Sequence, residues 1–478
     1  MSSIEQYSAA SREQNSVIEI SSDRCFSKIG KGQDAKDLPL HMLVMDTGQP
    51  WMPPEERRHP KTPEEVDELY RETIRQGMID HHSFDAAVRE LPEGATRRCA
   101  TKMVADFSED VLEQMQKRSV TEIVTHVDSD LDAISSTYLA KALLQSGDAS
   151  KMPSITKELA DIVNVVDYGR YQEKDPNRYA HSISGLFGGL KHILSDKQRV
   201  EMGKVWSDQA LDLSTKRQQA GEIASRYSEK LIKLTFEVLN ACNKQKMESG
   251  TIDLNFIELE GLPVSDRTKQ LLEKGVEITV QQYREFDKAL EQAEQHVATI
   301  TTKEGVQKDV PLVVFSEIST MSPLTVTNLG YLRFPPEAII AAFAGPDRKH
   351  GGDHYDIGIK AESSEFFTLD ALLMPMNKAE QAERERLFPN LSALAAGQEQ
   401  PNEEQAALLE RWKMTPEALQ KKWSELRKGF EQTGIGDPTV VVAGGSLVAA
   451  STTALLTKER FVETLKETLQ AKPVQKSE

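Results

Sequence analysis

The stretch TEIVTHVDSDLDAISS, residues 121–136, decides the fold of this chain. It opens with the apolar pair Ile123 and Val124, which is typical of a short buried strand. Its polar centre carries one imidazole and three carboxylates within seven residues: His126, Asp128, Asp130 and Asp132. From Ala133 to Gln145, apolar residues recur at helical spacing. The stretch therefore predicts a strand, a polar loop and a helix in succession, which is where open α/β sheets bind their ligands.

The charge of this loop points to a metal. Carboxylates that are buried next to one another are costly unless a cation compensates them. Carboxylates with only a few imidazoles suit Mn²⁺ or Mg²⁺ better than zinc or copper, which attract more cysteine and histidine. Two such ions, about 3.5–4 Å apart, form the arrangement that enzymes use for in-line attack at phosphorus. We therefore expect two divalent ions in this part of the chain.

The composition limits the remaining function classes. A chain of 478 residues is long enough for two or three domains. Its 75 acidic and 58 basic residues give a net charge of −17, which argues against binding of long duplex nucleic acid. A small phosphorylated substrate remains compatible with this charge, because metal ions reverse the local field. The three cysteines show no CxxC spacing, which argues against a disulfide scaffold or a zinc ribbon.

The chain also lacks the sequence features of membrane and secreted proteins. No apolar run approaches the length of a membrane span. The first residues, MSSIEQYSAASREQNS, have neither a basic start nor an apolar centre and do not resemble a secretory signal. We expect a soluble cytoplasmic protein that has no membrane partner; a homodimer stays open.

Three further apolar runs lead into polar clusters. They are His41–Met45 before Asp46, Gly77–Ile79 before Asp80-His81-His82, and Leu159–Val166 before Asp167. Helical patterns lie between them, at Pro63–Gln76 and Asp106–Lys117. We interpret the four runs as strands of a mostly parallel sheet with its functional residues along one edge. Asp46 has a second interpretation, as the residue that forms a turn ahead of Gly48.

The rest of the chain predicts a multidomain α/β protein. Its parts are a polar lead-in with a strand-like patch at Val17–Ile20 (1–36), a catalytic domain (37–195), a helical connector (196–305) and a smaller α/β C-terminal domain (306–478). In the connector, helical patterns run from Asp196 to Lys246 and from Gln281 to Ala298, and TIDLNFIELEGLPVSD between them predicts one or two strands. A charged helical insertion is expected at 378–432.

Four motifs together resemble the DHH phosphoesterase superfamily. IDHHSFD (79–85) resembles its DHH signature, and THVDSDLDAISS (125–136) resembles its H-x-x-x-D-x-D-A-I-x-S signature. VMDTGQP (44–50) is similar to its second motif and VVDYGRY (165–171) to its fourth. The spelling is most similar to the branch of nanoRNases and nucleotide-bisphosphate phosphatases, with family II pyrophosphatases nearby. The motif order differs from the family and looks circularly permuted, which a parallel sheet tolerates if the same strands adjoin.

The resemblance implies a role for each polar residue of these motifs. His126, Asp130 and Asp46 would hold one ion. Asp132, His81 and Asp167 would hold the other, with Asp46 bridging the two. His82 would face a substrate phosphate, and Asp80 would orient a ligand histidine.

Substrate contacts are also expected from the C-terminal half. Family members often carry a Gly-Gly-Gly-His turn there, and Ala443-Gly444-Gly445-Ser446 is similar to it but lacks the histidine and one glycine. Arg348 and Lys349 lie in the Gly-rich loop GPDRKHGGDHYD, which is either a solvated hairpin turn or a phosphate grip. Lys360 lies near where the family often has a basic substrate contact. We interpret Arg97-Arg98 as an exposed loop pair.

These observations favour hydrolysis of a phosphoester or phosphoanhydride bond by a two-metal centre. The substrate would be a small phosphorylated molecule or a short oligonucleotide; pyrophosphate, polyphosphate, cyclic dinucleotides and 3′-phosphonucleotides stay open. The alternative is a catalytically degenerate member that keeps the fold as a binding or regulatory module. The complete ligand set favours the enzyme, and the altered Gly-Gly-Ser turn favours the alternative.

Overall fold

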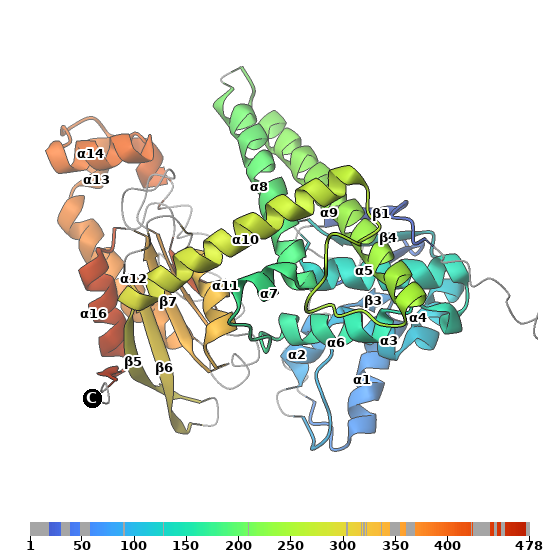
Figure 1. The fold of residues 1–478 in the computed structure, drawn as a ribbon. Coiled ribbons are helices and arrows are strands. Elements are labelled where there is room, and N and C mark those ends of the chain that lie inside the picture. The colour runs from blue at the N-terminus through green and yellow to red at the C-terminus, as the bar shows by residue number, and fades with distance from the viewer. Residues whose placement is uncertain are drawn as a thin grey trace, which may run out of the picture. The chain divides into compact units, whose positions relative to one another are not determined.

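The chain forms two compact units. The computed structural model describes residues 19–29, 39–47, 58–88, 91–127, 129–208, 210–302, 305–316, 318, 321, 323–335, 337–344, 354–359, 369–421, 423, 440–443, 447–450 and 455–474. Unit 1 comprises Met1–Asp167 and Asn177–Thr279, and unit 2 comprises Tyr168–Pro176 and Val280–Glu478 (Figure 1). The four-part division expected from the sequence stays a prediction.

Unit 1 is built on a four-stranded parallel sheet. Its strands are β1 (Cys25–Ile29), β2 (Met42–Met45), β3 (Met78–Ile79) and β4 (Glu122–His126), in the order β1-β4-β2-β3. All three pairings are parallel, and Met45 lies opposite both Ile79 and Thr125. Because the strands run in the same direction and end level with one another, the residues that follow β2, β3 and β4 meet at one edge. The predicted parallel sheet is confirmed.

Helices cover this sheet and extend unit 1, and the last of them, α10, continues beyond Thr279 into unit 2. They are α1 (Pro63–Arg75), α2 (His82–Ala87), α3 (Ala100–Asp106), α4 (Ser108–Lys117), α5 (Leu131–Ser146), the short 3₁₀ helix η1 (Ala149–Lys151), α6 (Thr156–Asp167), α7 (Pro176–His181), α8 (Ile183–Ser207), α9 (Leu213–Ser249) and α10 (Asp266–Gln292). The predicted helices correspond to α1, α4 and α5. Every residue of α5 from Leu131 to Leu143 is buried, so this helix lies in the core of the unit.

Three local predictions are wrong. Leu159–Val166 belongs to helix α6 and is not a strand; its buried residues, Leu159, Ala160, Ile162 and Val163, lie on one helical face. A short apolar run of this kind does not separate a buried helix from a strand by periodicity. Of the strand-like patch Val17–Ile20, residues 17 and 18 lie outside the described residues, Glu19 and Ile20 lie outside any strand, and the described strand of the lead-in is β1. The segment 251–265 has no strand.

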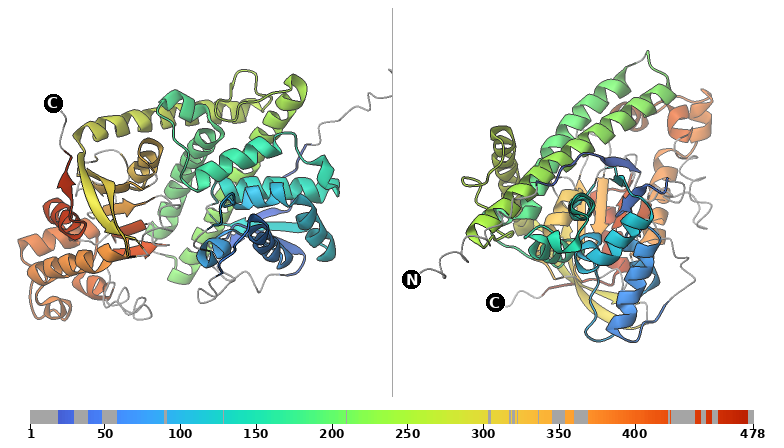
Figure 2. Two further views of the ribbon diagram at one scale, coloured as in Figure 1. Left: turned by 90° about the horizontal axis from the view of Figure 1, so that it is seen from below. Right: turned by 90° about the vertical axis from the view of Figure 1, so that its right-hand side faces the viewer.

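The long helices α8, α9 and α10 require close packing within unit 1. Helices α8 and α9 run side by side (Figures 1 and 2). Where α8 meets the part of α10 that belongs to unit 1, a Cβ atom on Gly189 would lie 2.7 Å from the Cα of Gly275. Only glycine permits backbones to approach this closely.

Unit 2 contains a seven-stranded mixed sheet with the order β11-β5-β6-β7-β8-β10-β9. Its strands are β5 (Glu294–Thr301), β6 (Gln307–Phe315), β7 (Ile339–Ala344), β8 (His354–Gly358), β9 (Val440–Ala443), β10 (Leu447–Ala450) and β11 (Lys472–Pro473). All pairings are antiparallel except that of β6 with β7. Strands β6 to β11 lie within 306–478, the part predicted as a smaller α/β domain, whereas β5 begins where the sequence pattern continued a helix to Ala298.

The helices of unit 2 pack on this sheet and on one another. They are α11 (Pro323–Arg333), α12 (Asp370–Leu387), α13 (Leu391–Ala395), α14 (Glu403–Trp412) and α16 (Lys458–Thr468). The described part of 378–432 is largely helical, as predicted. The chain is thus an α/β protein with a parallel sheet in unit 1. Among the described helices, none is both long and apolar enough to cross a membrane.

Candidate metal centre

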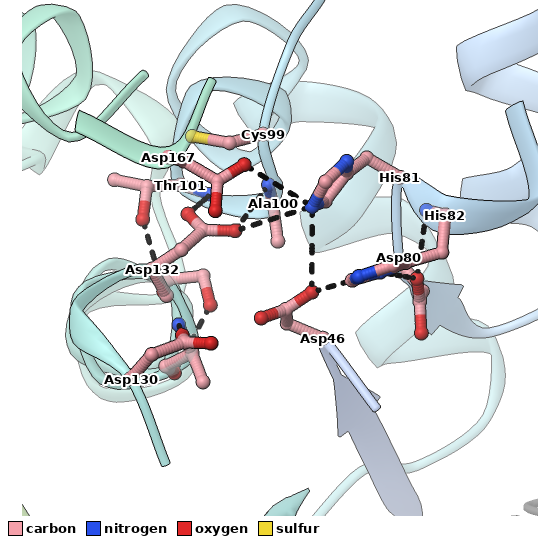
Figure 3. A network of polar contacts seen from close by, with 12 residues as sticks. Asp46, Asp80, His81, His82, Cys99, Ala100, Thr101, Asp130, Asp132 and Asp167 are labelled. Atoms are coloured by element: carbon pink, nitrogen blue, oxygen red, sulfur yellow. Dashed lines mark hydrogen bonds and ion pairs between the residues drawn. The ribbon is translucent and has the colours of Figure 1, made fainter. Parts of the chain in front are cut away.

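Seven polar residues from separate elements converge at the carboxyl edge of the parallel sheet. All of them except His126 are labelled in Figure 3. Asp46 follows β2, His81 and His82 follow β3, His126 ends β4, Asp130 and Asp132 lie at the start of α5, and Asp167 ends α6. The structure therefore brings together every residue that the sequence predicted as a metal ligand. Asp167 reaches the cluster from the end of helix α6, whereas the sequence predicted that it follows a strand.

The cluster contains two groups that have the spacing of metal ligands and share no residue. In the first group, ligand atoms of Asp46, His126 and Asp130 all lie within 4.8 Å of one another. The second group, His81, Asp132 and Asp167, meets the same limit. Ligands about 2.0–2.6 Å from one ion are separated by roughly 3–5 Å, so both groups fit Mn²⁺ or Mg²⁺.

Asp46 lies between the two groups. Its Oδ1 is 3.6 Å from Nε2 of His81 and 3.4 Å from Nδ1 of His82, and these three residues form a third group within 4.8 Å. The same Oδ1 is buried without a hydrogen-bond partner among the described residues. An orphaned carboxylate oxygen of this kind is costly unless a cation binds it.

The backbone at Asp46 is unusual. Its φ of 43° lies in the left-handed region, which aspartate adopts more readily than most residues. Its N–H donates to the carbonyl oxygen of Ile79 at 2.8 Å and so ties the end of β2 to the end of β3. The turn places the Asp46 carboxylate beside the residues that follow β3.

The contacts of Asp80 differ from the expectation. Its two oxygens accept hydrogen bonds from the N–H of Thr47 at 2.8 Å and from the N–H of His82 at 2.9 Å. The Asp80 Oδ1 also lies 2.9 Å from Nδ1 of His82. Asp80 therefore orients His82, which was expected to face substrate. On the Nδ1 side of His81, the neighbouring carboxylate is that of Asp85, whose Oδ2 lies 2.6 Å from Nδ1.

The other ligand residues are fixed by local hydrogen bonds. Asp130 is the N-cap of α5 and accepts the N–H of Ala133 at 3.0 Å. The two oxygens of Asp132 accept the N–H groups of Ala100 and Thr101, each at 2.8 Å, at the start of α3. Nδ1 of His126 lies 2.9 Å from the carbonyl oxygen of Val127. Because a carbonyl only accepts, that nitrogen carries the proton, and Nε2 keeps the lone pair that a metal needs.

The pKa values in this cluster are shifted by burial and by neighbouring charges. Burial raises the pKa of Asp132, and the neighbouring Asp46 raises it further, to about 6. Burial also raises the pKa of Asp167 well above its ordinary value. Burial lowers the pKa of His81, but Asp167 and Asp85 outweigh it and raise that pKa to about 10. Buried carboxylates this close together favour positive charge beside them, and the donor set fits divalent cations, which would compete with protons for the same atoms.

Two residues beside the cluster were missed or misread in the sequence. Arg97 was expected on the surface, but it is 1% exposed and donates to Asp85 Oδ1 at 2.8 Å. Asp85 received no role. A usable signal existed, because residues four apart share a helix face and Asp85 follows His81 by four positions in a helical pattern.

The predicted substrate contacts of the C-terminal half lie outside the described residues. They are Arg348, Lys349, Lys360, Gly444 and Gly445. Asp128, which lies between His126 and Asp130 in the sequence, is also outside the described residues.

Comparisons with known proteins add little to this geometry. No protein-family model matches the chain, and no curated protein matches it. One solved structure is similar, that of a protein whose description assigns it to a family of ribosomal proteins and names a DHH domain. It is 14% identical, with a TM-score of 0.21, and the match covers 76% of this chain and 66% of that one. A TM-score this low does not show a shared fold, so a function has to be argued from the residues of the cluster.

Proposed function

We propose that this chain is a metal-dependent phosphoesterase of the DHH type. It would hydrolyse a phosphoester or phosphoanhydride bond in a small phosphorylated substrate or a short oligonucleotide. One observation carries the proposal. Two groups of residues have the spacing of metal ligands, each with one histidine and two aspartates, and Asp46 of the first group lies next to the second. The motif resemblance of residues 44–50, 79–85, 125–136 and 165–171 supports the same conclusion independently.

The chain's own residues would divide the work of binding and orientation. His126, Asp130 and Asp46 would hold one ion, and His81, Asp132 and Asp167 the other, with Asp46 between them. Bound Mn²⁺ or Mg²⁺ would polarise the phosphoryl oxygens and lower the pKa of a bound water. His82 has a side chain that is 34% exposed, and its Nδ1 lies against Asp80. Burial lowers the pKa of His82, but Asp46 and Asp80 outweigh it and raise that pKa well above its ordinary value, so the protonated ring would keep an Nε2–H to donate to a substrate phosphate.

Metal content and turnover test this proposal together. The full chain, stripped with a chelator, is titrated with Mn²⁺ by calorimetry and then assayed on pyrophosphate, short polyphosphate, a cyclic dinucleotide, a 3′-phosphonucleotide and a dinucleotide. We expect about two Mn²⁺ per chain and Mn²⁺-dependent hydrolysis of at least one substrate. Asp196→Asn, which changes an exposed carboxylate on α8, is the control and should leave both unchanged.

Two results would contradict the proposal in different ways. A chain that binds no Mn²⁺ would overturn the metal centre. A chain that binds two Mn²⁺ ions and hydrolyses none of these substrates would favour the alternative, a binding or regulatory module that keeps the ligand set without turnover.

A further inference from the structure

A buried ionic chain leads away from one of the two ligand groups. Nδ1 of His81 lies 2.6 Å from Asp85 Oδ2, and Asp85 Oδ1 accepts from Nη1 of Arg97 at 2.8 Å. Both oxygens of Asp85 are thus engaged, one by the imidazole and one by the guanidinium. With a proton on Nδ1, the Nε2 lone pair of His81 is directed toward Asp46, Asp132 and Asp167 (Figure 3).

Arg97 is itself held in place from two sides. Its Nη2 donates to the carbonyl oxygen of Val88 at 2.8 Å, beyond the end of α2. Its own carbonyl oxygen accepts from Nδ2 of Asn164 on α6 at 3.1 Å, and Asn164 Oδ1 accepts the N–H of Cys99 at 2.8 Å. The guanidinium is 1% exposed, so an ordered, desolvated cation faces Asp85.

The same segment reaches the other two residues of this group. Ala100 and Thr101, three and four residues after Arg97, donate their N–H groups to the two oxygens of Asp132. Asn164, which the segment binds, lies one helical turn before Asp167 in α6. Residues 97–101 therefore contact Asp132 directly, His81 through Asp85, and the helix that carries Asp167.

We propose that Asp85 and Arg97 are positioning residues for one ion, the ion of His81, Asp132 and Asp167. The inference rests on the proposed metal centre. In it, the ligand histidines of the two ions have different hydrogen-bond partners behind them. His81 is backed by a carboxylate that a buried arginine holds, whereas the contact of His126 Nδ1 is with a backbone carbonyl. A carboxylate behind a ligand imidazole increases its basicity and fixes its orientation, so the His81 ion binds more tightly and loads first.

Titration of the full chain with Mn²⁺ tests this assignment. In Asp85→Asn, the amide would present either its oxygen to His81 and its NH₂ to Arg97, or the reverse, and one of the two contacts fails in each case. We expect the tighter of the two binding steps to weaken by about 10- to 100-fold while the other keeps its affinity. Arg97→Met should change the same step in the same direction, because it removes the charge that fixes Asp85.

The neighbouring arginine provides a matched control. Arg98 forms ion pairs with Asp67 and Asp106, each at 2.8 Å, and it contacts no residue of the ligand groups in the described structure. Arg98→Met therefore removes a similar arginine–carboxylate pair and should leave both Mn²⁺ affinities unchanged. The melting temperatures of the metal-free variants report the structural cost of each change separately from its effect on the ions.

Electron paramagnetic resonance of bound Mn²⁺ provides a second readout. At one equivalent of Mn²⁺, the wild type should fill one site, and Asp85→Asn should distribute the ion over both. If Asp85→Asn and Arg97→Met keep both wild-type affinities, or if both steps weaken equally, the positioning role is wrong while the metal centre stands. A wild-type chain that binds no Mn²⁺ overturns the metal centre and this inference with it.

Discussion

Asp46 is the residue on which the two ligand groups depend. It is buried, adopts a left-handed backbone conformation and lies within ligand distance of residues from both groups. Asn tolerates the same φ and has nearly the same shape, so Asp46→Asn removes the charge without straining the turn. We expect the variant to lose both Mn²⁺ ions, whereas Asp130→Asn should weaken only one. Calorimetric titration of the two variants measures this difference.

The stability of metal-free Asp46→Asn is a control on that result. The Asp46 carboxylate raises the pKa of Asp132, after the larger effect of burial, which shows that the charges repel. Removing one of them should leave the melting temperature in chelator equal to that of the wild type or higher. A large fall would mean that Asp46 acts through the fold, and the loss of metal would then not identify a ligand.

The residues that meet in the two ligand groups were predictable from the sequence, and their hydrogen-bond partners were not. Aspartates and histidines that follow short apolar runs are visible as local patterns, and the parallel sheet brings them together. The pairing of Asp85 with Arg97 joins residues twelve positions apart across a loop, and no sequence period encodes it. Arg97 was misread for the same reason, because arginine is mostly exposed unless a buried partner compensates it.

At the scale of single elements, the contact between α8 and α10 makes a sharp prediction. A Cβ on Gly189 would lie 2.7–2.8 Å from backbone atoms of Gly275, while a Cβ on the adjacent Gly188 would meet no atom within 4 Å. Gly189→Ala should therefore destabilise unit 1 by about 1–3 kcal/mol, because the helices must separate. Gly188→Ala should stabilise it by up to about 1 kcal/mol through helix propensity.

Urea unfolding of the two variants, followed by helical circular dichroism, distinguishes these outcomes. Equal stability changes of the same sign would show that the two helices do not approach as closely as the structure has them. The pair is informative because both residues are glycines of one helix and differ only in their surroundings.

Some element types followed from local signals in the sequence, and others did not. Helix α1 has a proline at its first turn, acidic residues behind an N-cap threonine and one buried face, and its predicted limits differ from the observed ones by one residue. In α6, the run Leu159–Val166 is apolar except at Asp161 and Asn164, and the three-residue spacing of these two is a helical signal that the strand interpretation did not use. Strand β1 was missed because it is short and lies at the edge of the sheet, where only its pairing with β4 identifies it.

A buried carboxylate in unit 2 predicts a pH-dependent stability. Glu380 on α12 accepts the N–H groups of Leu455 and Leu456 at 2.8 and 3.2 Å, and the hydroxyl of Tyr355 lies at 3.5 Å. Burial raises its pKa to about 7, against the lowering effect of the two backbone N–H groups and Arg384. The pKa of Glu380 is therefore higher in the folded than in the unfolded state. Its contribution to the free energy of unfolding is complete below the unfolded pKa and is lost as the pH rises through about 7.

The free energy of unfolding of unit 2 should fall by about 3 kcal/mol between pH 4.5 and pH 8. Glu380→Gln cannot ionise and should not show it, whereas Glu385→Gln, an exposed residue of the same helix, should behave like the wild type. Urea unfolding at the two pH values, followed by Trp412 and Trp423 fluorescence after Trp51 and Trp206 are replaced by Phe, measures the difference. The same fall in Glu380→Gln would assign the pH dependence to another group.

At the scale of the whole molecule, metal binding should affect the stability of the two units differently. All residues of the two ligand groups belong to unit 1, and Asp167 is the last residue of its first segment. A ligand that binds only folded unit 1 stabilises that unit by RT ln(1 + [L]/Kd), about 2.7 kcal/mol at one hundred times Kd. We therefore expect Mn²⁺ to stabilise unit 1 selectively.

Hydrogen exchange of the full chain with and without Mn²⁺ tests this expectation. Peptides from β4 and α5 should exchange more slowly when Mn²⁺ is present, and peptides from β6 and β7 should not change. Asp46→Asn, which should bind no ion, is the control and should show no slowing in either unit. Equal slowing in both units of the wild type would mean that residues of unit 2 also hold the ions. The ligand set would then extend beyond the six residues of the two ligand groups.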